Sequence, residues 1–187
     1  MKKILILVDP QVDFITGSLA VPGAFEAMQN FCKESNKGML DKYDKILVTL
    51  DFHPKDHCSF KQFGGTFPPH CIEHTEGAAV FGPVAKVLHS HDNVEYFIKG
   101  TDKKTEEFSI LKSPSGHIDF VAAANWFRGY EIHVAGIAGD FCVHDTIKDL
   151  CNNYEVFDKI KVLKDFIASI DGGQKLDKLI KDLGLKI

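Results

Sequence analysis

Five short apolar runs divide the chain, and each is rich in leucine or β-branched residues. They cover residues 2–8, 44–50, 94–99, 130–137 and 158–165. Within each run the apolar residues follow one another with little alternation, which is typical of strands covered on both faces. The pattern therefore predicts a buried, mainly parallel sheet.

Segments with helical spacing lie between and after these runs, at residues 24–40, 116–130, 141–151 and 174–184. The last of them carries an apolar stripe and stops at Gly184, a residue common just beyond helix C-termini. Alternation of strands with helices predicts a doubly wound α/β fold, with helices on both faces of the sheet. Two segments, residues 51–83 and 100–117, have little periodicity, and long irregular loops inside a compact domain are usually functional.

Length and composition agree with one compact α/β domain over residues 1–187. The chain is 44% hydrophobic and carries a formal charge of -4, with basic and acidic residues interspersed. No basic patch for nucleic acid and no stretch of membrane-spanning length are present, so we expect a small-molecule partner. The possibility of a homo-oligomer stays open.

The cell compartment is inferred from the start of the chain and from its thiols. The apolar run near the N-terminus stops at Asp9 and Pro10, too early for a secretory signal. Five cysteines are an odd number in a chain of this size, so free thiols and a cytoplasmic location are expected.

Polar residues follow four of the predicted strands at the point where each strand ends. Asp9 ends the first, Asp51 and His53 the second, Lys99 the third, and the loop to Cys142 follows the fourth. Because carboxyl ends of parallel strands meet at one edge of the sheet, where ligands bind, these side chains should converge. Taken singly, Asp9 could instead cap a turn, and Lys99 could be a solvated strand-end lysine.

Cys142 falls in the first turn of a predicted helix, after the small residues of "GIAGD". There a thiol feels the positive end of the helix dipole, and a nearby Lys99 would lower its pKa further. The same turn offers unpaired backbone N–H groups for an oxyanion. The alternative is a small core residue, since free cysteine is often buried.

Asp51 and His53 lie two positions apart on an extended strand end, so both side chains can reach one cation. Carboxylate and imidazole ligands suit zinc, manganese or iron. Further donors follow at His57, His70 and His74, with Cys58 and Cys71 beside them. These residues could instead lie at the surface or form a closed structural zinc site, but Asp51 in line with the strand favours an open site.

Five segments resemble, in order and spacing, the blocks of nicotinamidases within the isochorismatase-like cysteine hydrolase family. They are "LVDPQVDFITGSL" (7–19), "TLDFHPKDHCSF" (49–60), "FPPHCIEHTEGA" (67–78), "FIKG" (97–100) and "GIAGDFCV" (136–143). The resemblance implies a Rossmann-like three-layer fold with a six-stranded sheet. It also implies hydrolysis of nicotinamide to nicotinate and ammonia in NAD salvage, through a thioester, with pyrazinamide as a second substrate.

Site residues are carried over by position from this resemblance. Cys142 matches the nucleophile, Asp9 the general base and Lys99 the cation that orients them. Backbone N–H groups of Ala138 and Cys142 match the oxyanion hole, with a cis peptide between Ile137 and Ala138. Phe14 and Phe67 match the aromatic residues that sandwich the substrate ring. One divalent ion is implied, with zinc favoured over manganese or iron, and its ligands match Asp51, His53 and His70, with His57 as a further candidate.

Several positions depart from the family pattern. Phe67, Phe108 and Phe141 stand where tryptophan, tyrosine or histidine is common, and His74 stands where glycine is usual. These departures bear on the shape of the pocket and leave a related amidohydrolase acting on another small amide as the alternative. A scaffold protein without catalysis is disfavoured because Asp9, Lys99 and Cys142 are all present.

Overall fold

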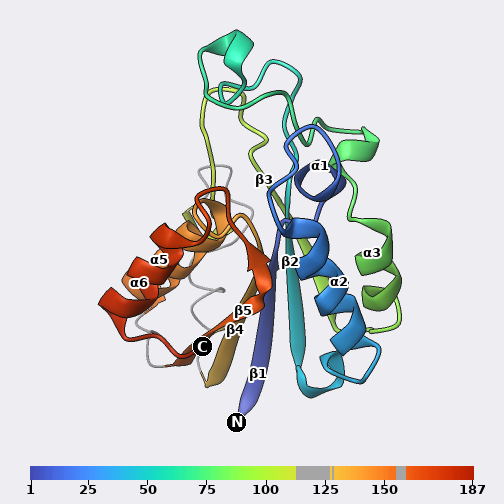
Figure 1. The fold of residues 1–187 in the computed structure, drawn as a ribbon, viewed down its shortest axis with the longest axis vertical. Helices are drawn as coiled ribbons and strands as arrows, with labels where there is room; N and C mark the ends of the chain where they lie inside the picture. The colour runs from blue at the N-terminus through green and yellow to red at the C-terminus, as the bar shows by residue number, and fades with distance from the viewer. Residues whose placement is uncertain (113–126, 128, 155–158) are drawn as a thin grey trace.

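The computed structural model describes residues 1–112, 127, 129–154 and 159–187. Its centre is one parallel sheet with the strand order β3-β2-β1-β4-β5 (Figure 1). The strands are β1 (Lys2–Val8), β2 (Lys45–Asp51), β3 (Val94–Lys99), β4 (Tyr130–Ile137) and β5 (Ile160–Ala168). All five predicted strands are confirmed, although β5 continues three residues past the predicted end.

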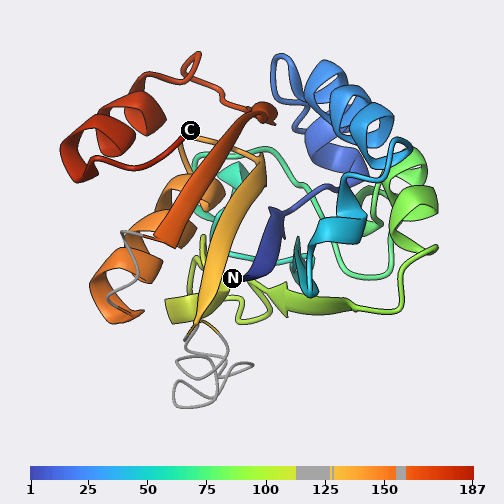
Figure 2. The same ribbon diagram turned by 90° about the horizontal axis from the view of Figure 1, so that it is seen from below.

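Helices cover both faces of this sheet (Figures 1 and 2). One face carries α2 (Ala24–Ser35) and α3 (Gly82–Leu88), and the other carries α5 (Cys142–Tyr154) and α6 (Gln174–Leu183). The short helix α1 (Val12–Ile15) and four 3-10 helices lie in the loops among the described residues. The 3-10 helices cover Leu40–Lys42, Lys61–Phe63, Glu76–Ala78 and Ile110–Lys112. The predicted three-layer α/β fold is therefore confirmed. Within the described part of the chain, every helix is too short or too polar to cross a membrane.

The central strand β1 shows why its sequence is apolar without alternation. Leu5 and Leu7 point to the core beneath α2 and α3, whereas Ile4, Ile6 and Val8 point to the core beneath α5 and α6. All five side chains are at most 1% exposed. Successive residues of a strand face opposite sides, so a strand between two helical layers must be apolar at every position.

Three expectations differ from the structure or fall outside it. The helix predicted over residues 24–40 ends at Ser35, because the chain turns at Gly38, whose φ of 84° is left-handed. The helix predicted over residues 116–130 lies almost entirely outside the described residues. The six-stranded sheet is wrong for the described residues, which form five strands; beyond β5 there is only an isolated bridge from Lys161 to Lys186.

The strand order creates a crevice beside β1. The chain builds outward from β1 through β2 to β3, and then returns to place β4 on the other side of β1. At such a switch point the loops after the two neighbouring strands diverge, which leaves room for a ligand at the carboxyl edge. The loops that meet here follow Val8 of β1 and Ile137 of β4.

Gly136 lets β1 and β4 approach closely at that crevice. Its φ is 118°, and a Cβ at this position would lie 2.0 Å from the backbone oxygen of Val8. Gly136→Ala is expected to lower the free energy of unfolding by about 3 kcal/mol, because both the left-handed backbone and the clash with a buried strand oppose it. Urea denaturation measures this change.

Gly82→Ala is the matched control. Gly82 begins α3, its φ is ordinary, and no atom lies within 4 Å of the Cβ position. This variant should change the unfolding free energy by less than about 1 kcal/mol. Equal stabilities for the two variants would contradict the close approach at Gly136.

Candidate active site at the carboxyl edge of the sheet

Lys99 is the centre of a buried charge cluster. Its Nζ lies 2.8 Å from Oδ2 of Asp9 and donates a hydrogen bond to Oδ1 of Asp51. Asp51 and Lys99 are register partners on β2 and β3, and Asp9 directly follows β1. Burial opposes the charged form of Lys99, but the carboxylates of Asp51 and Asp9 hold its pKa well above the usual range. Lys99 is therefore a permanent cation at this edge.

Asp9 is held by its backbone as well as by Lys99. Its φ is 46°, its N–H donates to the Thr49 carbonyl, and its Oδ1 accepts a 2.6 Å hydrogen bond from the Thr49 hydroxyl. Burial raises the pKa of the Asp9 carboxyl, and the nearby Asp51 carboxylate adds to this against the opposing effect of Lys99. A raised carboxyl pKa suits a group that must accept a proton and later return it.

Cys142 is the first residue of α5, and its thiol faces the same cluster. The Lys99 ammonium donates to Sγ at 3.6 Å, and ligand atoms of Cys142, Asp9 and Asp51 all lie within 4.8 Å of one another. Lys99 lowers the thiol pKa, as expected, but burial outweighs its effect. Burial raises the pKa of Cys142 well above the usual range, and Asp9 and Asp51 reinforce this against Lys99. The raised pKa favours the protonated thiol, and attack by sulfur from that form requires a proton acceptor.

The turn before Cys142 presents backbone groups to the pocket. The peptide bond between Ile137 and Ala138 is cis, as the resemblance implies. The N–H groups of Phe141 and Val143, on either side of Cys142, both donate to the Ala138 carbonyl. The Cys142 N–H lies between them in the first turn of α5, where N–H groups have no acceptor within the helix.

Three side chains next to this cluster form a set that could hold a metal ion. The ligand atoms of Asp51, His53 and His70 lie within 4.8 Å of one another, and all three residues are buried. Asp51 and His53 come from β2 and the residues just after it, whereas His70 comes from the following long loop. The structure thus brings together the three residues that the sequence offered as ligands.

The hydrogen bonds of the two imidazoles fit a cation at this position. Nδ1 of His53 donates to the Gly100 carbonyl at 2.9 Å, and Nδ1 of His70 donates to the Pro68 carbonyl at 2.8 Å. Each bond leaves the Nε2 lone pair free, which is the usual way a second contact fixes the tautomer of a ligating histidine. Nε2 of His53 is fully buried with no hydrogen-bond partner in the described residues, and it lies 3.5 Å from Asp51 Oδ2. An orphaned, buried nitrogen beside a carboxylate fits a divalent ion.

The other two candidate histidines are placed differently. Both ring nitrogens of His57 already have partners: Nδ1 lies 2.8 Å from the Ser59 hydroxyl, and Nε2 lies 3.1 Å from the Thr105 carbonyl. His57 also stacks on His53 with ring centroids 4.0 Å apart. His74 is exposed, packs edge-on against Phe52, and belongs to none of the possible metal sets among the described residues.

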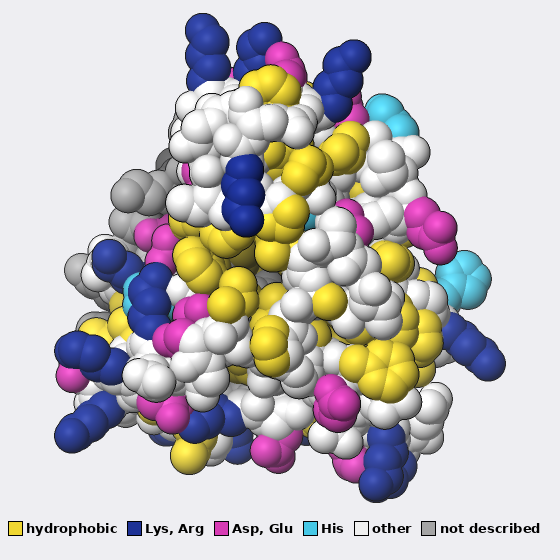
Figure 3. Space-filling model, turned by 45° about the horizontal axis from the view of Figure 1, so that its top comes forward, with side chains coloured by type: hydrophobic (Ala, Val, Ile, Leu, Met, Phe, Trp, Pro, Cys, Tyr) yellow, Lys and Arg dark blue, Asp and Glu magenta, His cyan; other side chains and the backbone are white. Residues whose placement is uncertain are grey.

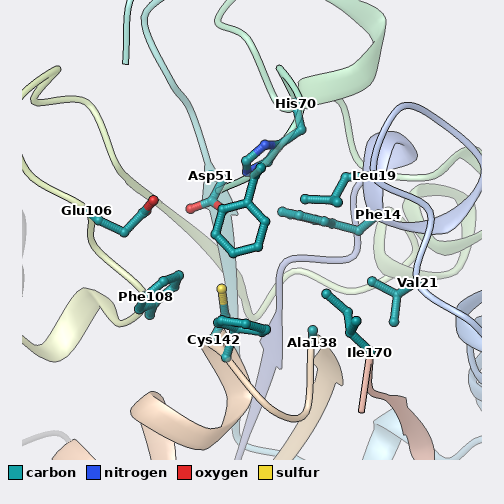
Figure 4. A pocket seen from close by; sticks show the side chains of 12 residues that line it. Phe14, Leu19, Val21, Asp51, His70, Glu106, Phe108, Ala138, Cys142 and Ile170 are labelled. Carbon is teal, nitrogen blue, oxygen red and sulfur yellow. The ribbon is translucent and has the colours of Figure 1, made fainter. Parts of the chain in front are cut away.

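A mainly apolar pocket opens over these groups (Figures 3 and 4). Figure 3 shows hydrophobic side chains gathered around a hollow on this face. The rings of Phe14 and Phe67 lie on the pocket wall, with centroids 5.4 and 5.7 Å from the ring of His70. Phe141 contacts both Phe67 and Phe108, at 5.4 and 5.5 Å. A flat aromatic ligand would therefore meet phenyl faces on its sides and the thiol at its end.

Two residues of the site were missed from the sequence. Gln11 is fully buried, and its amide joins three backbone groups: it donates to the carbonyls of Asp51 and Ala78 and accepts from the Asp51 N–H. Glu106 lies on the irregular loop after Lys99 and lines the pocket. Gln11 resembles any loop glutamine, so no local signal marks it, whereas the position of Glu106 in a predicted functional loop was a usable signal.

Asp13, the carboxylate closest in sequence to Asp9, has a structural role. Its Oδ2 accepts from the Cys71 N–H at 2.7 Å and its Oδ1 from the Ser18 N–H at 3.0 Å. Asp13 thereby ties the loop that carries His70 to the segment after β1.

A buried thiol at a helix N-terminus, with a carboxylate and an ammonium beside it, is the arrangement of a cysteine hydrolase. Comparison with known proteins narrows this class. The chain is 33% identical over 161 residues to the nicotinamidase/pyrazinamidase of Mycobacterium tuberculosis, covering 81% of this chain and 80% of that protein. It therefore belongs to the nicotinamidases of the isochorismatase-like family.

Solved structures agree with this placement. PnC1 from L. infantum in complex with nicotinate superposes with a TM-score of 0.79 at 28% identity, covering 99% of this chain and 91% of that one. Pyrazinamidase of Pyrococcus horikoshii in complex with zinc gives a TM-score of 0.78 at 26% identity, covering 100% and 98%. No protein-family model matches the chain.

Gln11→Leu tests the buried amide. Replacing the amide leaves two carbonyls and one N–H of the site loops without partners, so the unfolding free energy should fall by about 3 kcal/mol. Gln29→Leu, at an exposed position of α2, should stay within about 0.5 kcal/mol of the parent. Denaturation of both variants in urea measures the difference, and a harmless Gln11→Leu would show that these bonds contribute little.

Proposed function

We propose that this protein hydrolyses nicotinamide to nicotinate and ammonia, a reaction of NAD salvage. The observation that carries the proposal is that the thiol of Cys142, the carboxylate of Asp9 and the ammonium of Lys99 meet beneath an aromatic pocket, directly beside the possible metal set. Membership in the nicotinamidases supports the same reaction.

The first half of the reaction follows from the protonation states. Asp9 accepts the proton of the Cys142 thiol, and the resulting thiolate forms a bond to the carboxamide carbon. The carbonyl oxygen becomes an oxyanion, which the backbone N–H groups of Ala138 and Cys142 stabilise. Lys99 compensates the negative charge of this cluster throughout.

The second half regenerates the enzyme. As the carbon–nitrogen bond breaks, Asp9 returns its proton to the leaving amine, which departs as ammonia and leaves a thioester. Water then attacks the thioester with Asp9 again accepting a proton, which releases nicotinate and restores the thiol. The carboxyl pKa of Asp9, raised by burial, helps it serve in both directions.

Asp51, His53 and His70 would hold one divalent ion, with zinc favoured and manganese or iron as alternatives. Bound there, the ion supplies a positive charge that a ring nitrogen of the substrate can approach. Phe14 and Phe67 hold the ring between their faces. A pyrazine ring also presents a nitrogen, so we expect pyrazinamide to be a second substrate, in line with the relatives named pyrazinamidase.

Cys142→Ala tests the nucleophile. Ammonia release from nicotinamide should fall by at least about 10³-fold, because no other group can form the thioester. Cys151→Ala, on the same helix α5, should retain activity near that of the parent, and circular dichroism should be alike for both variants. Near-normal turnover by Cys142→Ala would refute the nucleophile assignment, and release of ammonia from another small amide alone would favour the alternative substrate.

Removal of the metal tests the proposed ligands. Dialysis against a chelator should abolish most ammonia release and lower the melting temperature of the protein. Zinc, manganese and iron should then each be added back and the recovery of ammonia release measured. His53→Ala should lose the bound metal, as measured by elemental analysis, because its Nε2 faces the site. His74→Ala should retain it. Full activity in metal-free protein would contradict the metal's positioning role.

A further inference from the structure

Glu106 is a second acidic side chain at the metal set, contributed by a different loop. It follows β3 by seven residues and is partly buried in the wall of the pocket. In Figure 4 its carboxylate points toward that of Asp51, from the side opposite Phe14 and Leu19. The mechanism above does not use this residue.

Two possible metal sets share one residue. The first joins Asp51, His53 and His70; the second joins His53, His57 and Glu106, again with ligand atoms within 4.8 Å of one another. The shared residue is His53, and its Nδ1 is taken by the Gly100 carbonyl. Its Nε2, the buried nitrogen without a hydrogen-bond partner among the described residues, is therefore the atom left free to bind an ion in either set.

His57 is the weakest member of the second set. Its Nε2 donates to the Thr105 carbonyl and its Nδ1 accepts from the Ser59 hydroxyl, so ligation would break one of these bonds. Glu106 has no such conflict: its Oε1 accepts only a long 3.2 Å bond from the neighbouring Glu107 N–H, and its other oxygen has no hydrogen-bond partner in the described residues. Glu106 is therefore the free acidic donor beside His53. Among the described residues no set within 4.8 Å joins it with Asp51 or His70, so its side chain has to turn toward His53 Nε2 to share their ion.

The charges of the cluster also fit a divalent ion. Asp9 and Asp51 pair with the ammonium of Lys99, and Glu106 lies close enough to Asp51 for the two carboxylates to interact. A divalent ion would offset this concentration of acidic groups in a poorly solvated site.

We propose that Glu106 is a fourth protein ligand of the metal ion, supplied by the loop of residues 100–109 that covers the pocket. The inference rests on the proposed metal site at Asp51, His53 and His70. An ion that accepts five or six ligands retains an open position for the substrate. Because the ligands come from separate loops, metal binding also fixes the covering loop over the pocket.

The direct test is metal affinity, measured by competition with a chromophoric chelator. Glu106→Gln and Glu106→Ala should each weaken zinc binding by about 10- to 100-fold, whereas Glu106→Asp should recover part of the loss. Glu73→Gln removes the same charge from an exposed position outside the pocket and should bind as the parent does. An unchanged affinity in Glu106→Gln and Glu106→Ala would overturn the proposal.

A second test follows the covering loop itself. Lys103 and Lys104 are exposed on this loop, so trypsin should cleave after them, and mass spectrometry can follow these two cuts. Zinc should slow the cleavage in the parent and in Glu73→Gln but not in Glu106→Ala. Equal protection by zinc in Glu106→Ala would show that the metal does not hold the loop through this residue.

The outcomes separate this inference from the proposed function. If the parent binds no metal, the metal site itself is wrong. If the parent binds metal and Glu106→Gln binds it equally but has a raised KM for nicotinamide, Glu106 contacts the substrate instead. Loss of affinity with a parent-like circular dichroism spectrum supports the ligand assignment.

Discussion

The ammonium of Lys99 is the interaction on which the site depends. A fully buried charge is stable only with close partners of opposite sign, and Lys99 has two, Asp9 and Asp51. These three residues end three adjacent strands, so their pairing holds the carboxyl edge of the sheet in one arrangement. The Cys142 thiol completes the cluster. It comes from α5, which packs on the face of the sheet opposite α2 and α3.

This electrostatic arrangement explains how a cysteine can be reactive without a low thiol pKa. Burial and two carboxylates favour the protonated thiol of Cys142. Burial also raises the pKa of Asp9, which makes its carboxylate a stronger base for the proposed proton transfer than an exposed aspartate would be. Proton transfer can then accompany attack on the substrate, and no reactive thiolate has to persist in the empty pocket.

The loops that carry the metal set and the pocket wall are held by polar groups that do no chemistry. Gln11 joins the segment after β1 to the end of β2, and Asp13 joins it to the loop of His70. Gly100 lets the covering loop approach, since with a φ of 68° a Cβ there would lie 2.4 Å from the ring of His53. Irregular backbone over a pocket needs such bonds because it lacks those of a helix or sheet.

The sequence by itself determined the five strands and the α/β class, and it pointed to most of the residues that the structure brings together at the candidate site. Apolar runs report burial on both faces, and residues such as Asp9, Asp51 and Lys99 stand out because each ends such a run. Two predictions were wrong. The helix α2 ends earlier than its apolar spacing indicated, because Gly38 turns the chain, and the sixth strand, which was implied by the resemblance, is absent from the described residues. Only the tertiary structure decided which strands are neighbours, and hence that Lys99 lies between two carboxylates. It also decided the high thiol pKa of Cys142, the engagement of both His57 nitrogens, and the places of Gln11 and Glu106. Burial, charge balance and free lone pairs depend on atoms from distant parts of the chain, which no local pattern specifies.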